Sequence, residues 1–306
     1  MAVMSAARPR PVARRSLGHR LIRFARTPKG EMLLVLLLLT ALAAPRAGLA
    51  RVAPGLIGAA VAAMLTELAF ETIASGRWRF PDGALLTGLF VALILSPTAP
   101  WYVPTLTAML AVAYKYALRT RWANIFNPAA LALVAAYVLF ASGQSWWGGL
   151  PDLPPAWFAV LAVTGLYIAN RVNKLPLVLV FSAAYVALFT VVAFAGDPAR
   201  VAELFRAPDI NAAFFCACFM LTDPPTSPVR YRDQVWFGLI AAVVSAVVFL
   251  ELGGVYYLLA GVLAANAWET GRRWRRTGSR PLGAFGGRAA AAHTGRAAGQ
   301  SARTSR

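Results

Sequence analysis

Leu221-Thr222-Asp223-Pro224-Pro225-Thr226-Ser227-Pro228 closes an apolar run at 210–221 that is only about 12 residues long. A second stretch has the same form, because Leu95-Ser96-Pro97-Thr98-Ala99-Pro100 closes an apolar run of similar length at 84–95. Crossing a bilayer takes about 20 apolar residues, so neither run spans it unassisted. Short segments at matching places in two halves of a chain indicate an internal repeat with a binding site near the middle of the membrane. The alternative is that these prolines end short helices near the surface.

The rest of the chain has the composition of a membrane protein. Of its 306 residues 59% are hydrophobic and 14% are charged, and the mean hydropathy is +0.60. In soluble domains about a quarter of the residues are charged. Apolar segments are expected at 32–50, 52–74, 84–95, 101–118, 127–141, 156–170, 175–195, 210–221, 235–250 and 254–270. The predicted fold class is therefore an all-α integral membrane protein with about ten transmembrane segments.

The order of these segments predicts two inverted repeats of five. Because five is odd, the second copy enters the membrane from the other side, and the two proline turns lie on opposite faces. Helix ends in the interior leave N–H and C=O groups free to meet a ligand. The short, broken helices at 84–95 and 210–221 are therefore where we expect a site.

Positive charge is concentrated at the two ends of the chain. The formal net charge is +18; residues 1–30 hold eight Lys or Arg, residues 271–306 hold nine, and neither stretch has an acid. Such flanks stay in the cytoplasm, and their position at the ends rather than on one folded face argues against nucleic-acid binding. We predict a basic cytoplasmic tail at 1–30, a membrane domain at 31–270 and a basic disordered tail at 271–306. Both termini are then cytoplasmic, in the cytoplasmic membrane, with lipid as a partner.

Most connections agree with this orientation. The loop at 141–155 has no cation, as an outer loop should, whereas the loop with Arg46 and Arg51 is an exception. The connections predicted to be cytoplasmic hold Arg77 and Arg79, then Lys115, Arg119 and Arg121, then Arg171 and Lys174, then Arg230 and Arg232.

The first apolar run also allows a cleaved signal peptide. Residues 32–44 follow a basic segment and contain Ala41-Leu42-Ala43, a cleavage-site pattern. The basic segment is long and further spans follow, so we interpret 32–50 as a first membrane helix.

The sequence carries no pattern for soluble catalysis. Phosphate loops, dinucleotide-binding glycines, zinc-protease histidine pairs and nucleophile elbows are all missing. The only histidines, His19 and His293, lie in the basic ends, which argues against haem and histidine catalysis within the bilayer. Cys216 and Cys218 point to nearly opposite sides of a helix and make poor partners for one metal. We predict no catalytic residue and no metal, so redox chemistry would need an organic cofactor, most plausibly flavin.

Two glutamates stand out in the second segment. Glu67 and Glu71 are four residues apart on one helix face, and ionisable residues inside a membrane mark ion pathways. The alternative is an amphipathic helix end where Arg77 and Arg79 pair with them. Asn127-Pro128 opens another span with a capping Asn and a proline at the first helical position.

Three stretches together resemble the RnfD and NqrB membrane subunits. They are Asp82-Gly83-Ala84-Leu85-Leu86-Thr87-Gly88-Leu89 leading to Pro97, then Asn124-Ile125-Phe126-Asn127-Pro128-Ala129, then Phe219-Met220-Leu221-Thr222-Asp223-Pro224 with Thr226-Ser227-Pro228. The resemblance covers about residues 30–270 and leaves out the basic ends. The stretch Ala169-Asn170-Arg171-Val172-Asn173-Lys174-Leu175-Pro176 is similar to stand-alone relatives of RnfD.

The resemblance implies a ten-helix subunit of an ion-translocating electron-transport complex, built as inverted repeats and carrying flavin. In that family FMN is attached to the threonine of Ser-Gly-Ala-Thr, and this sequence lacks that motif; the nearest text is Ser142-Gly143-Gln144-Ser145. A flavin, FMN or riboflavin, would therefore be held without a covalent bond. By resemblance, its binding candidates are Asp82, Gly83, Asn127, Pro128, Asp223, Pro224, Thr226 and Ser227.

Two function hypotheses from different classes follow. The first is a membrane subunit, at most one part of an oxidoreductase, that passes electrons through flavin from a flavin or iron–sulfur reductase or other membrane redox subunits, with room for coupling to ion movement. The second is a small-solute channel or a cofactor-free scaffold on the same fold, because a fold does not fix a function. A bound chromophore would discriminate them.

Overall fold

The computed structural model describes residues 17–75, 80–120 and 123–277, and in these ranges the regular structure is helical. Four helices are long and apolar enough to cross a membrane by length and composition. They are α2 (Pro28–Ala47), α3 (Leu49–Ser75), α8 (Leu175–Ala195) and α11 (Tyr231–Leu252). This agrees with the predicted all-α membrane protein. Arg77, Arg79, Arg121, His293 and the outer parts of both basic tails lie outside the described residues.

The remaining helices are shorter or more polar. The α-helices are α1 (Leu17–Ala25), α4 (Asp82–Ile94), α5 (Tyr102–Ala117), α6 (Pro128–Phe140), α7 (Phe158–Arg171), α9 (Pro198–Val201), α10 (Asp209–Phe215) and α12 (Tyr257–Thr277). The short 3-10 helices are η1 (Trp147–Gly149), η2 (Pro155–Trp157) and η3 (Ala202–Phe205), and η4 (Cys216–Met220) is a π-helix that continues α10.

Local sequence explains where several helices begin. The hydroxyl of Thr27 accepts a hydrogen bond from the Gly30 amide, and Pro28 follows at the first helical position of α2. The Asn127 side chain accepts from the Ala130 amide at the start of α6, again with a proline next. A capping oxygen satisfies an amide that the helix leaves unpaired, and proline lacks that amide. The predicted Asn-Pro helix start is confirmed.

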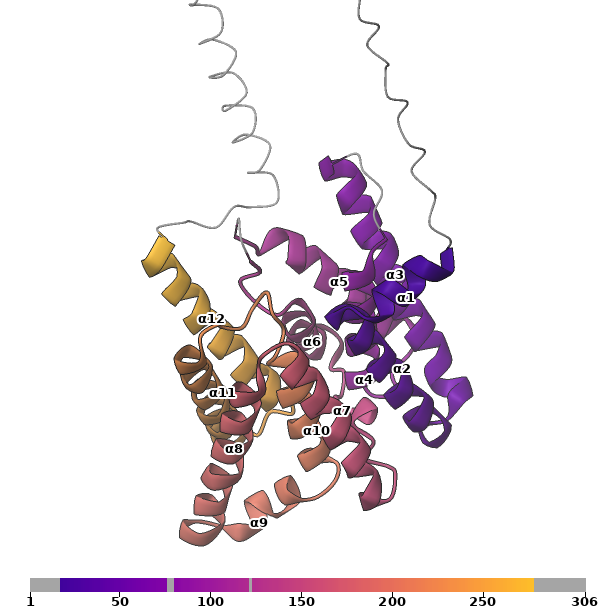
Figure 1. Cartoon of the computed structure of the whole chain (residues 1–306). Coiled ribbons are helices and arrows are strands. Elements are labelled where there is room, and N and C mark those ends of the chain that lie inside the picture. Colours follow the sequence, from indigo (N-terminus) through magenta and orange to yellow (C-terminus); the bar gives the residue numbers. More distant parts are fainter. Residues whose placement is uncertain (1–16, 76–79, 121–122, 278–306) are drawn as a thin grey trace, which may run out of the picture.

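Most of the longer helices pack in two groups (Figure 1). In the first group α3 packs against α4 and α5, and α5 against α6; in the second, α8 packs against α11, and α11 against α12. Between the groups, α2 contacts α7 and α6 contacts α12. A Cβ on Gly88 would lie 2.6 Å from the Ala59 carbonyl oxygen, so this glycine lets α4 approach α3 closely.

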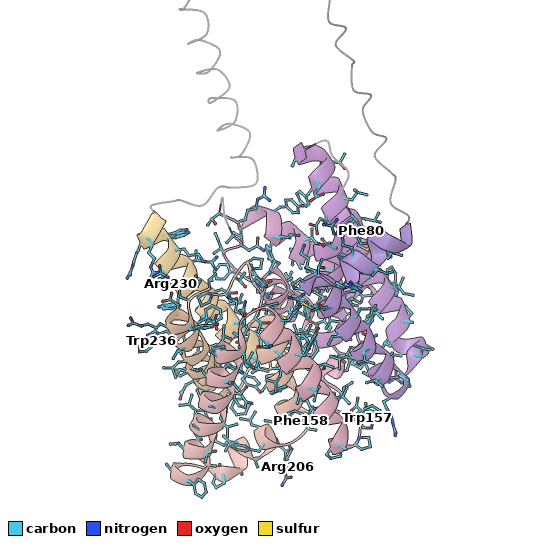
Figure 2. The ribbon with its side chains drawn as sticks, in the orientation of Figure 1. Phe80, Trp157, Phe158, Arg206, Arg230 and Trp236 are labelled. Carbon is cyan, nitrogen blue, oxygen red and sulfur yellow. The ribbon has the colours of Figure 1, made fainter. Side chains whose placement is uncertain are left out.

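Two ends of the molecule can be distinguished. The start of α1 and the end of α12 lie at one end, here called the terminal face (Figure 1). Phe80 and Arg230 lie toward this face, whereas Trp157, Phe158 and Arg206 lie toward the other, here called the opposite face (Figure 2).

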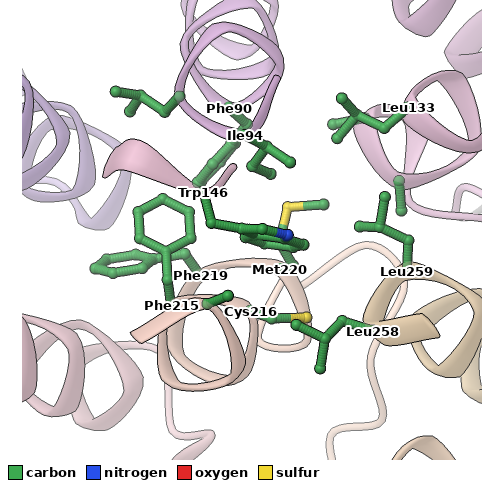
Figure 3. Close-up of a cluster of buried hydrophobic side chains, with 14 of the residues drawn as sticks. Phe90, Ile94, Leu133, Trp146, Phe215, Cys216, Phe219, Met220, Leu258 and Leu259 are labelled. Atoms are coloured by element: carbon green, nitrogen blue, oxygen red, sulfur yellow. The ribbon is translucent and has the colours of Figure 1, made fainter. Parts of the chain in front are cut away.

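The two short segments predicted from the proline turns run inward from different faces. The one expected at 84–95 lies in α4, and the one expected at 210–221 lies in α10 and η4. The two segments touch through Phe90 of α4 and Phe215 of α10, whose rings pack edge to face with 6.3 Å between their centroids. Figure 3 shows this contact within a buried apolar cluster that also holds Trp146 and Cys216. Both half-length helices therefore end in the interior.

Candidate functional site

The turn at 222–228 is closed by its own hydrogen bonds. The Asp223 carbonyl oxygen accepts from the Thr226 amide at 3.1 Å, the Ser227 amide at 3.0 Å and the Ser227 hydroxyl at 2.8 Å. The Thr226 hydroxyl also donates to the Asp223 carboxylate at 3.0 Å. Thr226 and Ser227 are buried, whereas Pro224 is exposed. The polar groups predicted to meet a ligand here first of all define the shape of the turn.

Two asparagines tie this turn to the first group of helices. The backbone N–H of Asn127 donates to Oδ1 of Asn266 at 2.8 Å, and the side-chain Nδ2 of Asn127 donates to the Met220 carbonyl at 3.3 Å. Asn266 in turn donates to the Thr226 carbonyl at 3.4 Å. Asn127 is thus linked to the 222–228 turn through Asn266. Asn266 was missed, although a lone amide in an apolar segment was a signal that could have found it.

Two cations hold the same turn from outside. Lys174 is 4% exposed and donates to the carbonyls of Ser227 and Pro228. Arg273 donates to the carbonyls of Pro225 at 2.8 Å and Ser227 at 3.0 Å, and pairs with Glu269 at 2.7 Å. Carbonyls that would otherwise be left bare are therefore paired with charged donors.

Burial shifts the ionisation of two groups at this turn. Burial lowers the pKa of Lys174 to about 8, with the charge of Arg273 acting in the same direction. Burial raises the pKa of Asp223 to about 6, against the hydrogen bond from Thr226 and the charges of Lys115 and Lys174. A desolvated charge is disfavoured in both signs, which explains the opposite directions.

A second charged cluster lies at the start of α4. Asp82 pairs with Lys29 at 3.2 Å and accepts from the Gly83 amide at 2.8 Å. Lys115 of α5 pairs with Glu67 of α3 at 2.6 Å, and Glu67 is only 6% exposed. Glu67 Oε2 has no hydrogen-bond partner in the described part of the chain. Glu71 lies one turn further along α3 and is partly buried.

Lys115 and Lys29 both lie near Gly83 at the start of α4. The Lys115 ammonium lies 3.3 Å from the place where a Cβ on Gly83 would stand, and Lys29 lies 4.0 Å from the same place. The predicted residues Asp82 and Gly83 therefore lie in one charged region around Lys115.

The described residues offer a flavin few unpaired groups. The hydrogen-bonding groups of Asn127, Thr226 and Ser227 are already bonded to protein, so they offer the isoalloxazine ring little. The ammonium groups of Lys115 and Lys29 lie near Gly83 at the positive end of α4, where each also pairs with a carboxylate, Glu67 and Asp82. The helix end and the two cations favour an anion, whereas the two carboxylates oppose one.

A family profile and two known proteins that match this chain all point to one family of membrane subunits. Residues 23–156 and 155–268 match the profile of the NQR2, RnfD, RnfE family. The D component of the proton-translocating ferredoxin:NAD(+) oxidoreductase complex of Clostridium ljungdahlii is 24% identical over 260 residues, which is 68% of this chain and 77% of that protein. The D component of the ion-translocating oxidoreductase complex of Stutzerimonas stutzeri is 38% identical over 94 residues, which is 28% of this chain and 26% of that protein.

Proposed function

Because this chain belongs to the NQR2, RnfD, RnfE family, we propose that it is the membrane subunit of an electron-transport system that passes electrons through a bound flavin. The match over residues 23–268 carries the proposal, and we propose the charged region around Lys115 as the place where the flavin binds. Both relatives are components of ion-translocating complexes, which favours coupling to ion movement and other redox subunits as partners. A flavin or iron–sulfur reductase is the partner class that would supply electrons.

The proposed topology is ten transmembrane segments in two inverted repeats of five. The matching contacts of α3 with α5 and of α8 with α11 support it. So does the entry of α4 and α10 from different faces. The two family matches meet at residues 155 and 156, between α6 and α7, where such repeats would join.

In the proposed orientation the protein lies in the inner membrane, and its terminal face is on the cytoplasmic side. Cations of several connections gather at this face, where Arg171 pairs with Glu31, Lys29 with Asp82 and Arg272 with Asp233. Clusters of Lys and Arg on one side of a membrane protein favour the cytoplasmic side. Anionic lipid headgroups or an acidic reductase would meet this surface.

The flavin would be held by charge and shape, without a covalent bond. When bound, a flavin accepts and releases one or two electrons. Lys29 and Lys115 would hold its phosphate at Gly83, and Asp82 fixes the position of Lys29. The turn residues Asp223, Pro224, Thr226 and Ser227, with Asn127 and Pro128, would wall the site through the network that they already form.

An ion path is proposed past the same charges. Glu67 keeps one carboxylate oxygen unpaired among the described residues while the other bonds Lys115, and Glu71 stands one helical turn away. A buried carboxylate with a free oxygen is a suitable station for a proton or a monovalent cation. Glu67→Gln should slow ion movement, measured as ion uptake by proteoliposomes that hold the purified protein.

The second function, a small-solute channel or cofactor-free scaffold, is favoured by one observation. The amides and hydroxyls of Asn127, Thr226 and Ser227 are occupied by protein partners, as in a purely structural turn. A redox subunit should carry a chromophore through purification, and this rival should not.

The visible absorption and fluorescence spectrum of the detergent-purified protein tests the proposal. We expect flavin that leaves on denaturation, and a Lys29→Ala protein that holds FMN about tenfold more weakly while Arg206→Ala, on the opposite face, holds it normally. A folded, colourless protein after incubation with FMN and riboflavin would refute flavin binding and favour the rival. Flavin that stays after denaturation would contradict non-covalent binding, and equal retention by both variants would remove Lys29 from the site.

A further inference from the structure

Arginines are concentrated where the start of α11 lies beside the end of α12. Residues 230–233 and 269–276 hold six arginines against two acids, Asp233 and Glu269. Arg272 pairs with Asp233 at 2.7 Å and with Glu269 at 2.8 Å. Arg273 pairs with Glu269 at 2.7 Å. Four exposed arginines remain in excess of these pairs: Arg230, Arg232, Arg275 and Arg276.

Contacts between the two helix ends bring these exposed arginines to one edge of the terminal face. Arg276 of α12 lies 3.9 Å from Asp233 of α11, so the last turn of one helix stands beside the first turn of the other. Arg232 and Arg275 are the chain neighbours of this pair. Figure 2 shows Arg230 and Trp236 at the outer edge of this part of the molecule.

The exposed side of α11 changes along the helix from charged to aromatic to apolar. Arg232, Trp236, Val243 and Val247 are separated by four or seven residues, so they lie on one helix face. Trp236 is 55% exposed, Val243 40% and Val247 53%. With a rise of 1.5 Å per residue, Trp236 lies about 6 Å and Val247 about 22 Å further from the terminal face than Arg232. This order is that of headgroups, interface and hydrocarbon in a bilayer.

Further aromatic side chains accompany the arginines on both helices. Tyr231 of α11 is 63% exposed and Trp274 of α12 is 37% exposed. Tryptophan and tyrosine are enriched at the membrane–water interface, because their rings are apolar and their N–H or O–H groups meet water. Both helices therefore carry the same interface pattern at the same end, and the exposed arginines lie at the level of the lipid headgroups.

An anionic phospholipid fits this pattern better than a soluble acidic protein does. A guanidinium binds a phosphate through two parallel hydrogen bonds, and basic clusters at the ends of membrane helices attract anionic headgroups. A soluble protein would meet the arginines but not the apolar part of the stripe, which runs about 16 Å from Trp236 to Val247. Acyl chains can follow that stripe. A zwitterionic lipid brings a cation that the exposed arginines repel.

We propose that the start of α11 and the end of α12 form a docking site for an anionic phospholipid. The exposed arginines bind its phosphate, and its acyl chains lie along Trp236, Val243 and Val247. The bound lipid offsets the mutual repulsion of the four arginines and so favours the contact between the two helix ends. The site requires a membrane around α11 and is independent of flavin and of electron transfer.

Native mass spectrometry of the full-length protein in detergent tests the site. Phosphatidylglycerol and phosphatidylcholine with the same acyl chains are added in equal amounts, and we expect phosphatidylglycerol to be retained in preference. Each arginine beside an anionic headgroup contributes about fivefold in affinity, so Arg232→Gln combined with Arg275→Gln should weaken phosphatidylglycerol binding about tenfold or more. Excess inorganic phosphate should not release the lipid, because it makes no contact with the stripe at Trp236.

Arg23→Gln is the matched control, because Arg23 is exposed on α1 at the same face, where α1 packs against α2 and not α11. It should keep the full preference for phosphatidylglycerol. Arg232→Lys combined with Arg275→Lys keeps the charge and should retain most of the binding, which separates loss of charge from loss of folding.

Equal retention of the two lipids by the wild type, or an unchanged preference in the glutamine variant, would overturn the proposal. Release of the lipid by inorganic phosphate would reduce the surface to a site for small anions. Binding of poly-glutamate that the glutamine variant loses, without any preference between the lipids, would assign the surface to an acidic protein instead.

Discussion

The two half-length helices end at similar places in the interior but meet different surroundings. The α10 helix continues through η4 into the 222–228 turn, where Asn127, Asn266 and Lys174 occupy the backbone carbonyls. The α4 helix ends at the 95–100 turn, where Ser142 and Gln144 stay unpaired among the described residues. The backbone carbonyls have protein donors at both ends, since Ile94 accepts from the Ser145 and Trp146 amides. Only the second end also holds side chains that stay unpaired among the described residues.

This difference shows that ending a helix and leaving polar groups for a ligand are separate properties, although the same sequence pattern is used to predict both. Proline after a short apolar run predicts that a helix stops there, and α4 and the α10–η4 run do stop at Ile94 and Met220, both of which are buried in the protein. What the freed groups then bond depends on residues far away in the chain. A self-satisfied network fixes a position, because every member has a partner, whereas orphaned groups retain capacity for a ligand.

The largest expected effect is at the 222–228 turn. Asn266→Leu removes the acceptor of the Asn127 amide and the donor to the Thr226 carbonyl, and leaves both buried. Each unsatisfied group costs about 1–3 kcal/mol, so the free energy of unfolding should fall by about 3 kcal/mol. Denaturant unfolding in detergent micelles measures this. A loss below about 1 kcal/mol would mean that the 222–228 turn does not hold the two groups of helices together.

Sequence reasoning found the parts of the 222–228 turn but not its connections. The family resemblance singled out Asn127, Asp223, Thr226 and Ser227 as flavin-binding candidates, because their motifs are local, but it did not predict the hydrogen bonds that they form. Asn266 was not singled out, since its role depends on α12 packing against α6, a contact between residues 139 positions apart. The same limit applied to Lys115, whose pairing with Glu67 joins two helices of the first group.

The unpaired groups at the end of α4 escaped prediction for a different reason. Ser142-Gly143-Gln144-Ser145 invites comparison only with an attachment motif that it lacks, and polar loop residues ordinarily face water. Their burial arises because Trp146 and Trp147 pack into the apolar interior and draw the loop inward. Four spans could be identified from length and hydropathy, while the shorter helices depend on tertiary packing for their membrane position.

A substitution at the end of α4 should raise stability, in contrast to the loss expected for Asn266→Leu. Gln144→Met keeps similar side-chain length and removes two orphaned polar atoms, so the free energy of unfolding should rise by about 1 kcal/mol. The same unfolding assay measures it. A loss of more than about 1 kcal/mol would show that the amide has a structural partner, and the contrast between the two ends would fail.

The pH dependence of stability should also distinguish the 222–228 turn from the end of α4, with a smaller effect. The pKa of Asp223 is raised from 3.8 to about 6, so the folded state binds more protons in that window and stability falls as pH rises from about 4 to 6. The pKa of Lys174 is lowered from 10.5 to about 8, so the unfolded state binds more protons and stability rises with pH from about 8 to 10.5.

Variants assign these two slopes. Asp223→Asn should flatten the lower window and Lys174→Met the upper one, as measured by unfolding midpoints across pH. The 95–100 turn and the 141–149 loop contain no titratable side chain. Gln144→Met should therefore shift the whole profile without changing its shape, and a changed slope in that variant would contradict the assignment.

The smallest effect is expected among the cations of the opposite face. Arg206 pairs with Glu203 at 3.9 Å, and both side chains are at least 70% exposed. Exposed pairs contribute about 0–1 kcal/mol, so Arg206→Ala should change the unfolding midpoint within error. Arg273→Ala, in contrast, removes a donor to the Pro225 carbonyl and one of the two donors to the Ser227 carbonyl. It also leaves Glu269, which is 2% exposed, with one cation fewer. Comparable losses in the two arginine variants would mean that charge alone, rather than the closure of the 222–228 turn, determines how arginine contributes to stability.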